Sequence, residues 1–195
     1  MRWFLILFDD IPIDKVSVKS GHNSPEVVTA CRCVNVGLFI SRDLRREVIV
    51  SITKGKFDDM TIVSFPGNTL KRVSPDERSI SFFLLKSLST AENLPRNSNQ
   101  ILDNGIIVAR ASLAEFISGC SPERVVVARG KGDYILDSTL LQDNVILIYE
   151  TGTNVDFTGV EFQNFVEFGV HYTQPCPPHP ERFILDVNML LDTEE

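Results

Sequence analysis

Residues 3–8 read Trp-Phe-Leu-Ile-Leu-Phe, an apolar run that ends at the acidic pair Asp9-Asp10. The run predicts a first buried strand. The next strong signal is Ser24-Pro25-Glu26, a helix N-cap followed by proline at the first helical position. A buried strand followed by a helix is the beginning of an α/β pattern.

Strand-like and helix-like segments then alternate along the chain, which predicts an α/β domain with a largely parallel sheet. Further strands are expected at residues 48–52, 61–65, 105–108, 124–128, 144–149 and 169–173. Helices are expected at residues 25–39 and 181–191, and after capping boxes that begin at Ser74, Ser112 and Thr158. Residues 91–104 are polar and are interpreted as a linker or an exposed loop.

The composition is that of a globular protein, with 195 residues, of which 43% are hydrophobic and 23% charged. No apolar run approaches the ~18 to 20 residues of a membrane-spanning helix, and no signal-peptide pattern develops at the start. The four cysteines form no Cys-x-x-Cys pair and the three histidines are scattered, so we expect neither disulfides nor a metal site. These features predict a cytoplasmic protein.

The charge is distributed unevenly along the chain, whose formal net charge is −7. Residues 1–86 contain 13 basic and 10 acidic side chains, whereas residues 87–195 contain 6 and 16. Nucleic-acid binding needs a local basic surface rather than a basic protein, so the acidic total does not exclude RNA. An ordinary solvated face explains the same asymmetry.

Two charged segments, 41–47 and 71–78, lie at the ends of predicted elements, where functional sites are often built. Arginine paired with aspartate there can hold a guanidinium ready for a phosphate or a base edge. Alternatively, the aspartates only neutralise neighbouring arginines or cap helices. The sequence contains no Gly-x-Gly-x-x-Gly, Walker or Gly-x-Ser-x-Gly motif. We expect the thiols of Cys31-Arg32-Cys33 to be buried rather than reactive.

These segments resemble a known family. The run from Cys31 to Val48, with Ser41-Arg42-Asp43-Leu44-Arg45-Arg46-Glu47 at its centre, is followed by Val73-Ser74-Pro75-Asp76-Glu77-Arg78-Ser79-Ile80. Both motifs are similar to those of the archaeal tRNA (pseudouridine-54-N1)-methyltransferases of the SPOUT superfamily. The similarity is strong over residues 25–85 and weaker but collinear afterwards.

The resemblance implies one SPOUT domain over residues 1–195, with a basic RNA-facing half at 1–90 and a cofactor-binding half at 105–195 that ends in a trefoil knot. It also implies a homodimer, S-adenosylmethionine as methyl donor and the T-arm of tRNA as partner, with no metal or membrane. The expected catalytic positions are Asp43, Arg45, Arg46, Asp76 and Arg78. The arginines would hold tRNA phosphates or a developing oxyanion, and the aspartates would orient them or accept a proton.

The family's cofactor contacts fall, by collinear alignment, at Ala128, Tyr149, Tyr172, Thr173, Gln174, Pro175, Cys176, Pro177 and Phe183. This part of the sequence departs from the family pattern. Tyr149 replaces a glycine, and Phe183 replaces a loop cysteine. The prolines of the segment 175–180 have no amide hydrogen to offer an adenine. Two alternatives therefore stay open: a SPOUT-fold RNA-binding protein with weak or lost cofactor binding, and a structural dimer without RNA.

Overall fold

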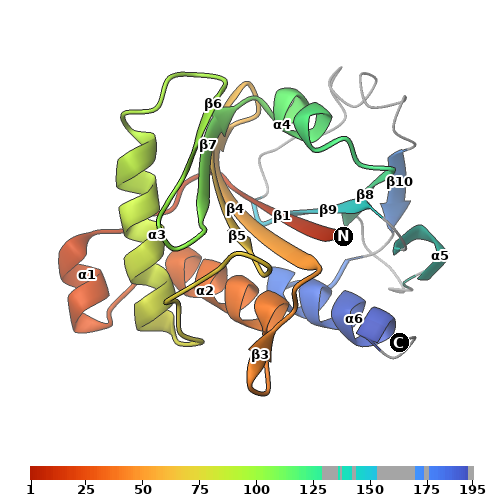
Figure 1. Ribbon diagram of the computed structural model, residues 1–195, viewed down its shortest axis with the longest axis horizontal. Coiled ribbons are helices and arrows are strands. Elements are labelled where there is room, and N and C mark those ends of the chain that lie inside the picture. Colours follow the sequence, from red (N-terminus) through yellow and green to blue (C-terminus); the bar gives the residue numbers. More distant parts are fainter. Residues whose placement is uncertain (129–135, 137, 142–143, 153–169, 174–175, 193–195) are drawn as a thin grey trace.

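The structure, a computed structural model, describes residues 1–128, 136, 138–141, 144–152, 170–173 and 176–192. These residues form an eight-stranded sheet flanked by helices, and a separate two-stranded hairpin (Figure 1). The strands are β1 (Arg2–Phe8), β2 (Phe39–Ile40), β3 (Asp43–Leu44), β4 (Val48–Lys56), β5 (Asp59–Pro66), β6 (Ser98–Ile101), β7 (Ile107–Ala111), β8 (Arg124–Ala128), β9 (Val145–Glu150) and β10 (Val170–Thr173). The helices are α1 (Lys15–Ser20), α2 (Pro25–Leu38), α3 (Glu77–Ala91), α4 (Leu113–Cys120), α5 (Ser138–Leu141) and α6 (Pro180–Asp192).

The sheet is mixed, in the order β10-β8-β9-β1-β4-β5-β7-β6. Strands β10, β8, β9, β1 and β4 pair in parallel, and β5, β7 and β6 continue the sheet in antiparallel pairs. The predicted α/β class is confirmed, with the parallel pairing confined to the part from β10 to β4. Because β1 pairs with both β4 and β9, one sheet joins the N-terminal and C-terminal halves of the chain.

The alternating side chains of β1 separate two hydrophobic cores. Phe4 and Ile6 pack in the core formed with α2, α3 and α6, whereas Leu5 and Leu7 pack in the core formed with α4. Figure 1 shows the same division, with α2 and α6 side by side below the sheet and α4 above it. The buried strand expected at residues 3–8 is therefore covered on both faces.

Helix N-termini follow the predicted capping chemistry in two places and depart from it in one. Ser24 caps α2, and Ser112 forms a capping box with Glu115 at the start of α4. The box predicted between Ser74 and Glu77 is wrong. Asp76 is the N-cap of α3, because its carboxylate accepts a hydrogen bond from the Ser79 amide at 2.8 Å.

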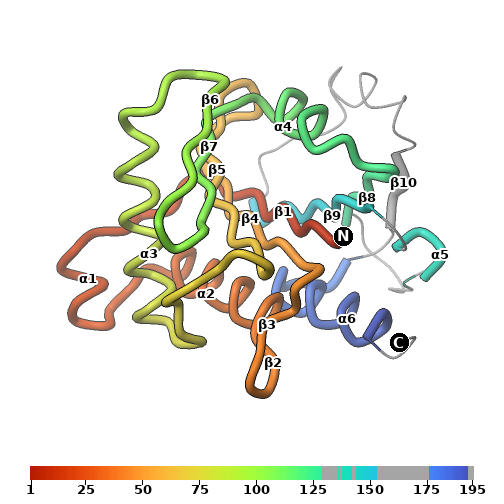
Figure 2. Tube along the Cα trace, viewed as in Figure 1, coloured from red at the N-terminus to blue at the C-terminus, as the bar shows by residue number. Residues whose placement is uncertain are grey.

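Five short elements were not expected from the sequence: α1, β2, β3, α5 and β6. Helix α1 is closed by Asp14 at its N-cap and by Gly21, whose φ of 74° is left-handed, at its C-cap. The interpretation of residues 91–104 as a linker is wrong in part, since β6 lies within them and pairs with β7. The segment 39–44 forms the β2–β3 hairpin, which projects from the body of the protein (Figure 2). The capping box predicted at Thr158, and residues 174–175 of the loop expected in the knot, lie outside the described residues.

Candidate functional site

The two charged motifs meet at one end of the sheet, where β4 begins and β5 ends. We call this region, made of loops 41–47 and 67–78, the basic end. Gly67 joins the loops: its amide donates to the Val48 carbonyl at 2.9 Å. A Cβ atom at this position would lie 1.9 Å from the Arg45 carbonyl oxygen, so only glycine fits. The backbone itself thus brings the two motifs together.

Arg45 is directed into the protein rather than toward solvent. Its side chain is 14% exposed. The guanidinium donates to Asp192 at 2.8 Å, and to the carbonyls of Val36 at 3.1 Å and Gly37 at 3.4 Å. Arg45 therefore binds the last turns of α2 and α6, which gives it a structural role, and the contact with RNA expected of it stays a prediction.

The Asp192 carboxylate also accepts a hydrogen bond from a second arginine, Arg2. Arg2 donates to its carboxylate at 2.9 Å and to the Asn188 side chain at 3.0 Å. Partial burial opposes ionisation of Asp192, but the hydrogen bonds from Arg45 and Arg2 hold its pKa below the usual range. The two ion pairs fasten the C-terminus of α6 beneath the basic end.

Arg46, the next residue, faces solvent. Its guanidinium donates to Asp43 at 2.7 Å, and the two side chains are 55% and 58% exposed. The Leu44 amide and the Arg46 guanidinium, both hydrogen-bonded to Asp43, hold the pKa of this carboxyl below its usual range. Asp43 therefore stays anionic near neutral pH and orients Arg46, which makes it a weak candidate for a proton acceptor.

Asp76 and Arg78 lie at the start of α3 and are both exposed. The Asp76 carboxylate caps the helix, and helix capping is one of the alternative roles that the sequence predicted for the aspartates. The loop that carries them is held against α2, because Asn35 donates to the Pro75 carbonyl at 2.7 Å and Asn23 donates to Glu77 at 2.8 Å. Arg78 forms no ion pair with any described residue, so its guanidinium is available to a ligand.

Two further arginines of the basic end have an unusual backbone. Arg42, in the turn of the β2–β3 hairpin, has a φ of 75°, and Arg72, in the second loop, has a φ of 59°. Both side chains are exposed. Left-handed φ values favour glycine, and a non-glycine residue held there often belongs to a functional surface. The basic end thus presents Arg42, Arg46, Arg72 and Arg78 to solvent.

The described residues among those expected at the cofactor lie at the other end of the sheet. We call this region, formed by the C-terminal ends of β8 and β9, the loop at Cys176 and Pro177, and Phe183 of α6, the cofactor end. Ala128 ends β8 and is buried, as is Tyr149 near the end of β9. The Tyr149 ring packs on Phe183 at a centroid distance of 5.9 Å.

The loop before α6 is fixed by the same tyrosine. The Tyr149 hydroxyl donates to the Pro177 carbonyl at 2.6 Å, and burial raises the pKa of Tyr149 well above its usual range. Cys176 is half-buried, and burial raises the pKa of its thiol as well. Tyr172 and Thr173 lie on β10, paired with Val127 and Ala128. Gln174 and Pro175 lie outside the described residues.

The two ends are far apart within one chain. Val48 is level with Arg2 in the pairing of β4 and β1, and Tyr149 is level with Ile6 in the pairing of β9 and β1. Along the strand direction, the two levels are four residues apart, at ~3.3 Å per residue. Across the sheet, β4 and β9 lie on either side of β1 and are two strand spacings of ~4.8 Å apart. The backbones of Val48 and Tyr149 are therefore about 16 Å apart. One sheet holds the two predicted groups of site residues but does not bring them together.

The remaining candidates are structural. Cys31 and Cys33 are buried, and burial, with the charges of Glu77 and Asp76, raises the pKa of the Cys31 thiol to about 12. The expectation of buried thiols is confirmed. Among the described residues, no three His, Cys, Asp or Glu side chains are grouped to hold a metal ion. None of the helices in the described ranges is long and apolar enough to cross a membrane.

The sequence interpretation missed four residues that line a cavity between α1, α3 and β6: Lys15, Lys19, Phe82 and Lys86. Asp76 and Arg78 line the same cavity. In the sequence, Asp14 and Gly21 are the residues that could have indicated this cavity, because they are the N-cap and C-cap of the short helix α1, which carries Lys15 and Lys19.

Comparison with known proteins gives consistent matches. The family model that matches residues 8–158 is described as "Putative SAM-dependent RNA methyltransferase". The tRNA (pseudouridine(54)-N(1))-methyltransferase of Methanococcus maripaludis strain C6 is 30% identical over 168 residues, which cover 83% of this chain and 82% of that protein. The Haloferax volcanii enzyme of the same name is 29% identical over 133 residues, covering 65% and 64% of the two chains.

Among solved structures, the chain is similar to Archaeoglobus fulgidus Nep1 bound to S-adenosylhomocysteine. The TM-score is 0.56, with 11% sequence identity, and the match covers 98% of this chain and 97% of the other. At this identity the likeness is one of fold. It extends over both halves of the chain.

Proposed function

The chain belongs to the family of SAM-dependent RNA methyltransferases, and we propose that it transfers the methyl group of S-adenosylmethionine to N1 of pseudouridine 54 in the T-loop of tRNA. One observation carries this proposal. The similarity to a tRNA (pseudouridine(54)-N(1))-methyltransferase extends over 83% of the chain, so it includes the basic end and the start of the cofactor end.

The described residues of the cofactor end fit an adenosine ligand. The C-terminal ends of parallel strands are where α/β proteins bind such ligands. Ala128 is small and Tyr149 is aromatic, which suits the apolar lining of a nucleoside pocket. Tyr149 packs on Phe183 and supports the loop at Pro177 through the hydrogen bond from its hydroxyl to the Pro177 carbonyl. When bound here, S-adenosylmethionine supplies an electrophilic methyl group on a cationic sulfur.

At the basic end, we assign RNA contacts to Arg46 and Arg78, which are exposed and have guanidinium groups that suit phosphates and developing anions. Asp43 orients Arg46 through their 2.7 Å hydrogen bond. Arg45 is a positioning residue, because its bonds to the ends of α2 and α6 fix the loop that presents Arg46. N1 of pseudouridine gives up its proton to solvent as it attacks the methyl carbon, S-adenosylhomocysteine leaves, and a nearby guanidinium stabilises the negative charge that develops on the base before the new N–C bond forms.

The separation of the two ends supports a homodimer with a shared site. A nucleophile must come within ~3 Å of the methyl carbon, whereas the two ends are about 16 Å apart along the sheet. In the dimer, the basic end of one protomer faces the cofactor end of its partner and they hold one tRNA between them. The same proposal includes the trefoil knot in the C-terminal half and a cytoplasmic location, where tRNA is the available substrate.

Methyl transfer tests the proposal directly. The purified protein is incubated with deuterated S-adenosylmethionine and a tRNA that carries pseudouridine at position 54, and the nucleosides are analysed by mass spectrometry. We expect deuterated N1-methylpseudouridine, and none from the matched tRNA with uridine 54, whose N1 carries the ribose. Absence of transfer by the folded, RNA-binding protein would contradict the proposal.

A second function, RNA binding without methyl transfer, is favoured by the two large side chains at the cofactor end. Tyr149 and Phe183 occupy space there, and the Pro177 carbonyl is already hydrogen-bonded. Calorimetric titration of S-adenosylmethionine separates the two functions. Micromolar binding at one site per chain supports the methyltransferase, and an absence of binding supports the RNA-binding alternative.

A further inference from the structure

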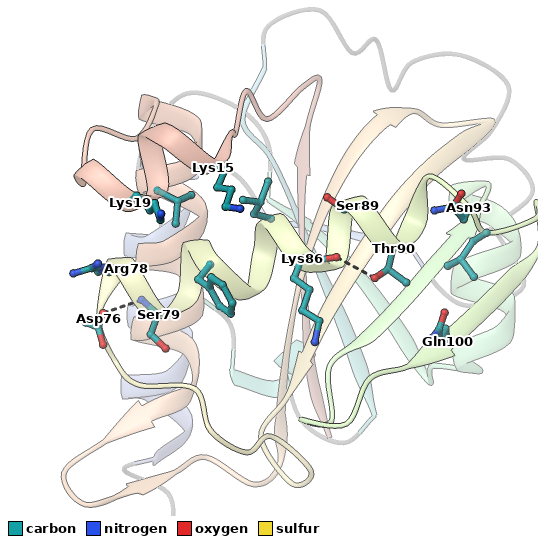
Figure 3. A pocket seen from close by; sticks show the side chains of 14 residues that line it. Lys15, Lys19, Asp76, Arg78, Ser79, Lys86, Ser89, Thr90, Asn93 and Gln100 are labelled. Atoms are coloured by element: carbon teal, nitrogen blue, oxygen red, sulfur yellow. Dashed lines mark hydrogen bonds between the residues drawn. The ribbon is translucent and has the colours of Figure 1, made fainter.

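A cavity with a volume of about 1070 Å³ lies along α3 and begins next to the basic end, at Asp76 and Arg78 (Figure 3). One side is α1, with Lys15 and Lys19, and the other is β6 with Gln100. Figure 3 shows Arg78 at the start of α3 and Lys86 farther along the same helix. We call this cavity the α3 groove.

The charge of the α3 groove is strongly positive for a chain with a net charge of −7. Lys15, Lys19, Arg78 and Lys86 line it, and none of them forms an ion pair with the residues that the structure describes. Asp76 is the single carboxylate of the lining, and it is hydrogen-bonded to the Ser79 amide at 2.8 Å. Four cations without counter-charges favour an anionic occupant.

The floor of the groove is apolar and contains an exposed aromatic ring. Phe82 is 53% exposed, an unusual state for phenylalanine on a helix. It is supported by an edge-on contact with Phe83 at a centroid distance of 5.2 Å, which holds the ring in place. Val18, Leu85 and Leu94 complete the apolar lining.

We propose that the α3 groove binds a single-stranded segment of the substrate RNA, with a base stacked on Phe82 and the phosphates held by Lys15, Lys19 and Lys86. An aromatic platform between basic side chains is the combination with which proteins hold single strands. Arg78 lines the groove and also belongs to the basic end, so a strand leaving that end enters the groove directly. The inference rests on the proposed function for the identity of the polyanion.

The test measures RNA binding without methyl transfer. The probes are the tRNA and an unstructured oligonucleotide that carries 2-aminopurine, whose fluorescence is quenched on stacking. Phe82→Ala is compared with Met189→Ala, another exposed apolar residue, on α6. Lys19→Gln is compared with Lys56→Gln, an exposed lysine of β4 that does not line the groove.

Phe82→Ala is expected to weaken binding of both probes about fivefold or more and to abolish the quenching. Lys19→Gln is expected to lower the slope of log K against log salt by about one, and the triple change Lys15→Gln, Lys19→Gln, Lys86→Gln by about three. The two controls are expected to bind as the wild type does.

Unchanged affinity, quenching and salt slope in the groove variants overturn the inference. It is also overturned if Phe82→Ala converts a dimer into monomers that bind RNA normally, because the groove is then an interface between copies. Failure of the proposed function gives a different result. If the wild-type protein does not methylate tRNA but Phe82→Ala still weakens RNA binding, the proposed activity is refuted and the RNA-binding role of the groove is supported.

Discussion

The two ends of the sheet differ in what their side chains are bound to. At the basic end, Arg46 and Arg78 are exposed, and the Arg78 guanidinium forms no ion pair with a described residue. At the cofactor end, Ala128 and Tyr149 are buried, and the tyrosine hydroxyl is bonded to the loop that it supports. The exposed arginines suit the large, charged ligand that we propose for the basic end, and the buried residues suit the small ligand that we propose for the cofactor end.

Within the basic end, two adjacent residues of one motif also differ in their contacts. Arg45 and Arg46 stand side by side in sequence, yet one is 14% exposed in its side chain and the other 55%. The buried arginine fixes the loop and the exposed one is presented by it. Variants can therefore separate the stability of the basic end from its binding of RNA.

The largest effect is expected from Gly67→Ala, which removes the joint between the two loops of the basic end. The added Cβ meets the Arg45 carbonyl oxygen at 1.9 Å, so the backbone must move, and we expect a loss of about 3 kcal/mol or more in unfolding free energy. Urea denaturation measures it. Gly119→Ala, on α4 with no atom near its Cβ, is the control and should stabilise the protein by about 0.5 kcal/mol. Equal stabilities of the two variants would remove the role given to Gly67.

The next effect contrasts Arg45→Ala with Arg46→Ala. Arg45→Ala deprives Asp192 and two helix carbonyls of a donor, and since Asp192 is partly exposed we expect a loss of about 1 to 3 kcal/mol. Arg46→Ala breaks an exposed pair and should change stability by less than about 0.5 kcal/mol. Salt titrations of tRNA binding by Arg46→Ala should show a slope lower by about one. The reverse assignment of the two effects would refute the division of tasks.

Tyr149→Phe gives a smaller effect, at the cofactor end. The variant leaves the Pro177 carbonyl without its buried donor, which should cost about 1 kcal/mol of stability and loosen the loop. We expect weaker binding of S-adenosylmethionine by calorimetry and unchanged tRNA binding. Weakened tRNA binding with unchanged cofactor affinity would contradict the roles proposed for the two ends of the sheet.

Much of the fold could be predicted because its signals are local. The apolar run 3–8 became the central strand, and the caps at Ser24 and Ser112 begin helices as expected. The N-cap of α3 is Asp76 rather than the predicted Ser74. Both side chains can accept an amide hydrogen bond, so the sequence alone does not distinguish them. The Glu77 side chain, which the predicted capping box needs, is bound to Asn23 instead. Strand β6 was missed because a polar edge strand has no apolar pattern.

The candidate site could be predicted less well, because the task of an arginine depends on packing. The sequence places Arg45 and Arg46 in one motif, but only the position of Asp192, far along the chain, shows that one of them is buried. The α3 groove was missed for a similar reason: Lys15 and Lys19 come from α1, whereas Lys86 and the ring of Phe82 come from α3, and no spacing in the sequence joins the two helices.

The shared site is tested most directly by mixing two inactive variants. The first variant carries both Arg46→Ala and Arg78→Ala, which remove the exposed arginines of the basic end. The second carries Cys176→Trp, which blocks the cofactor end. Titration with S-adenosylmethionine checks cofactor binding by each variant, and denaturation checks that each is folded. If one site needs the basic end of one protomer and the cofactor end of its partner, mixed dimers contain one intact site. Co-expression in equal amounts then restores about one quarter of wild-type methyl transfer to tRNA, since half of the dimers are mixed. No recovery from dimers shown to be mixed would contradict the shared site and place the whole reaction within one chain.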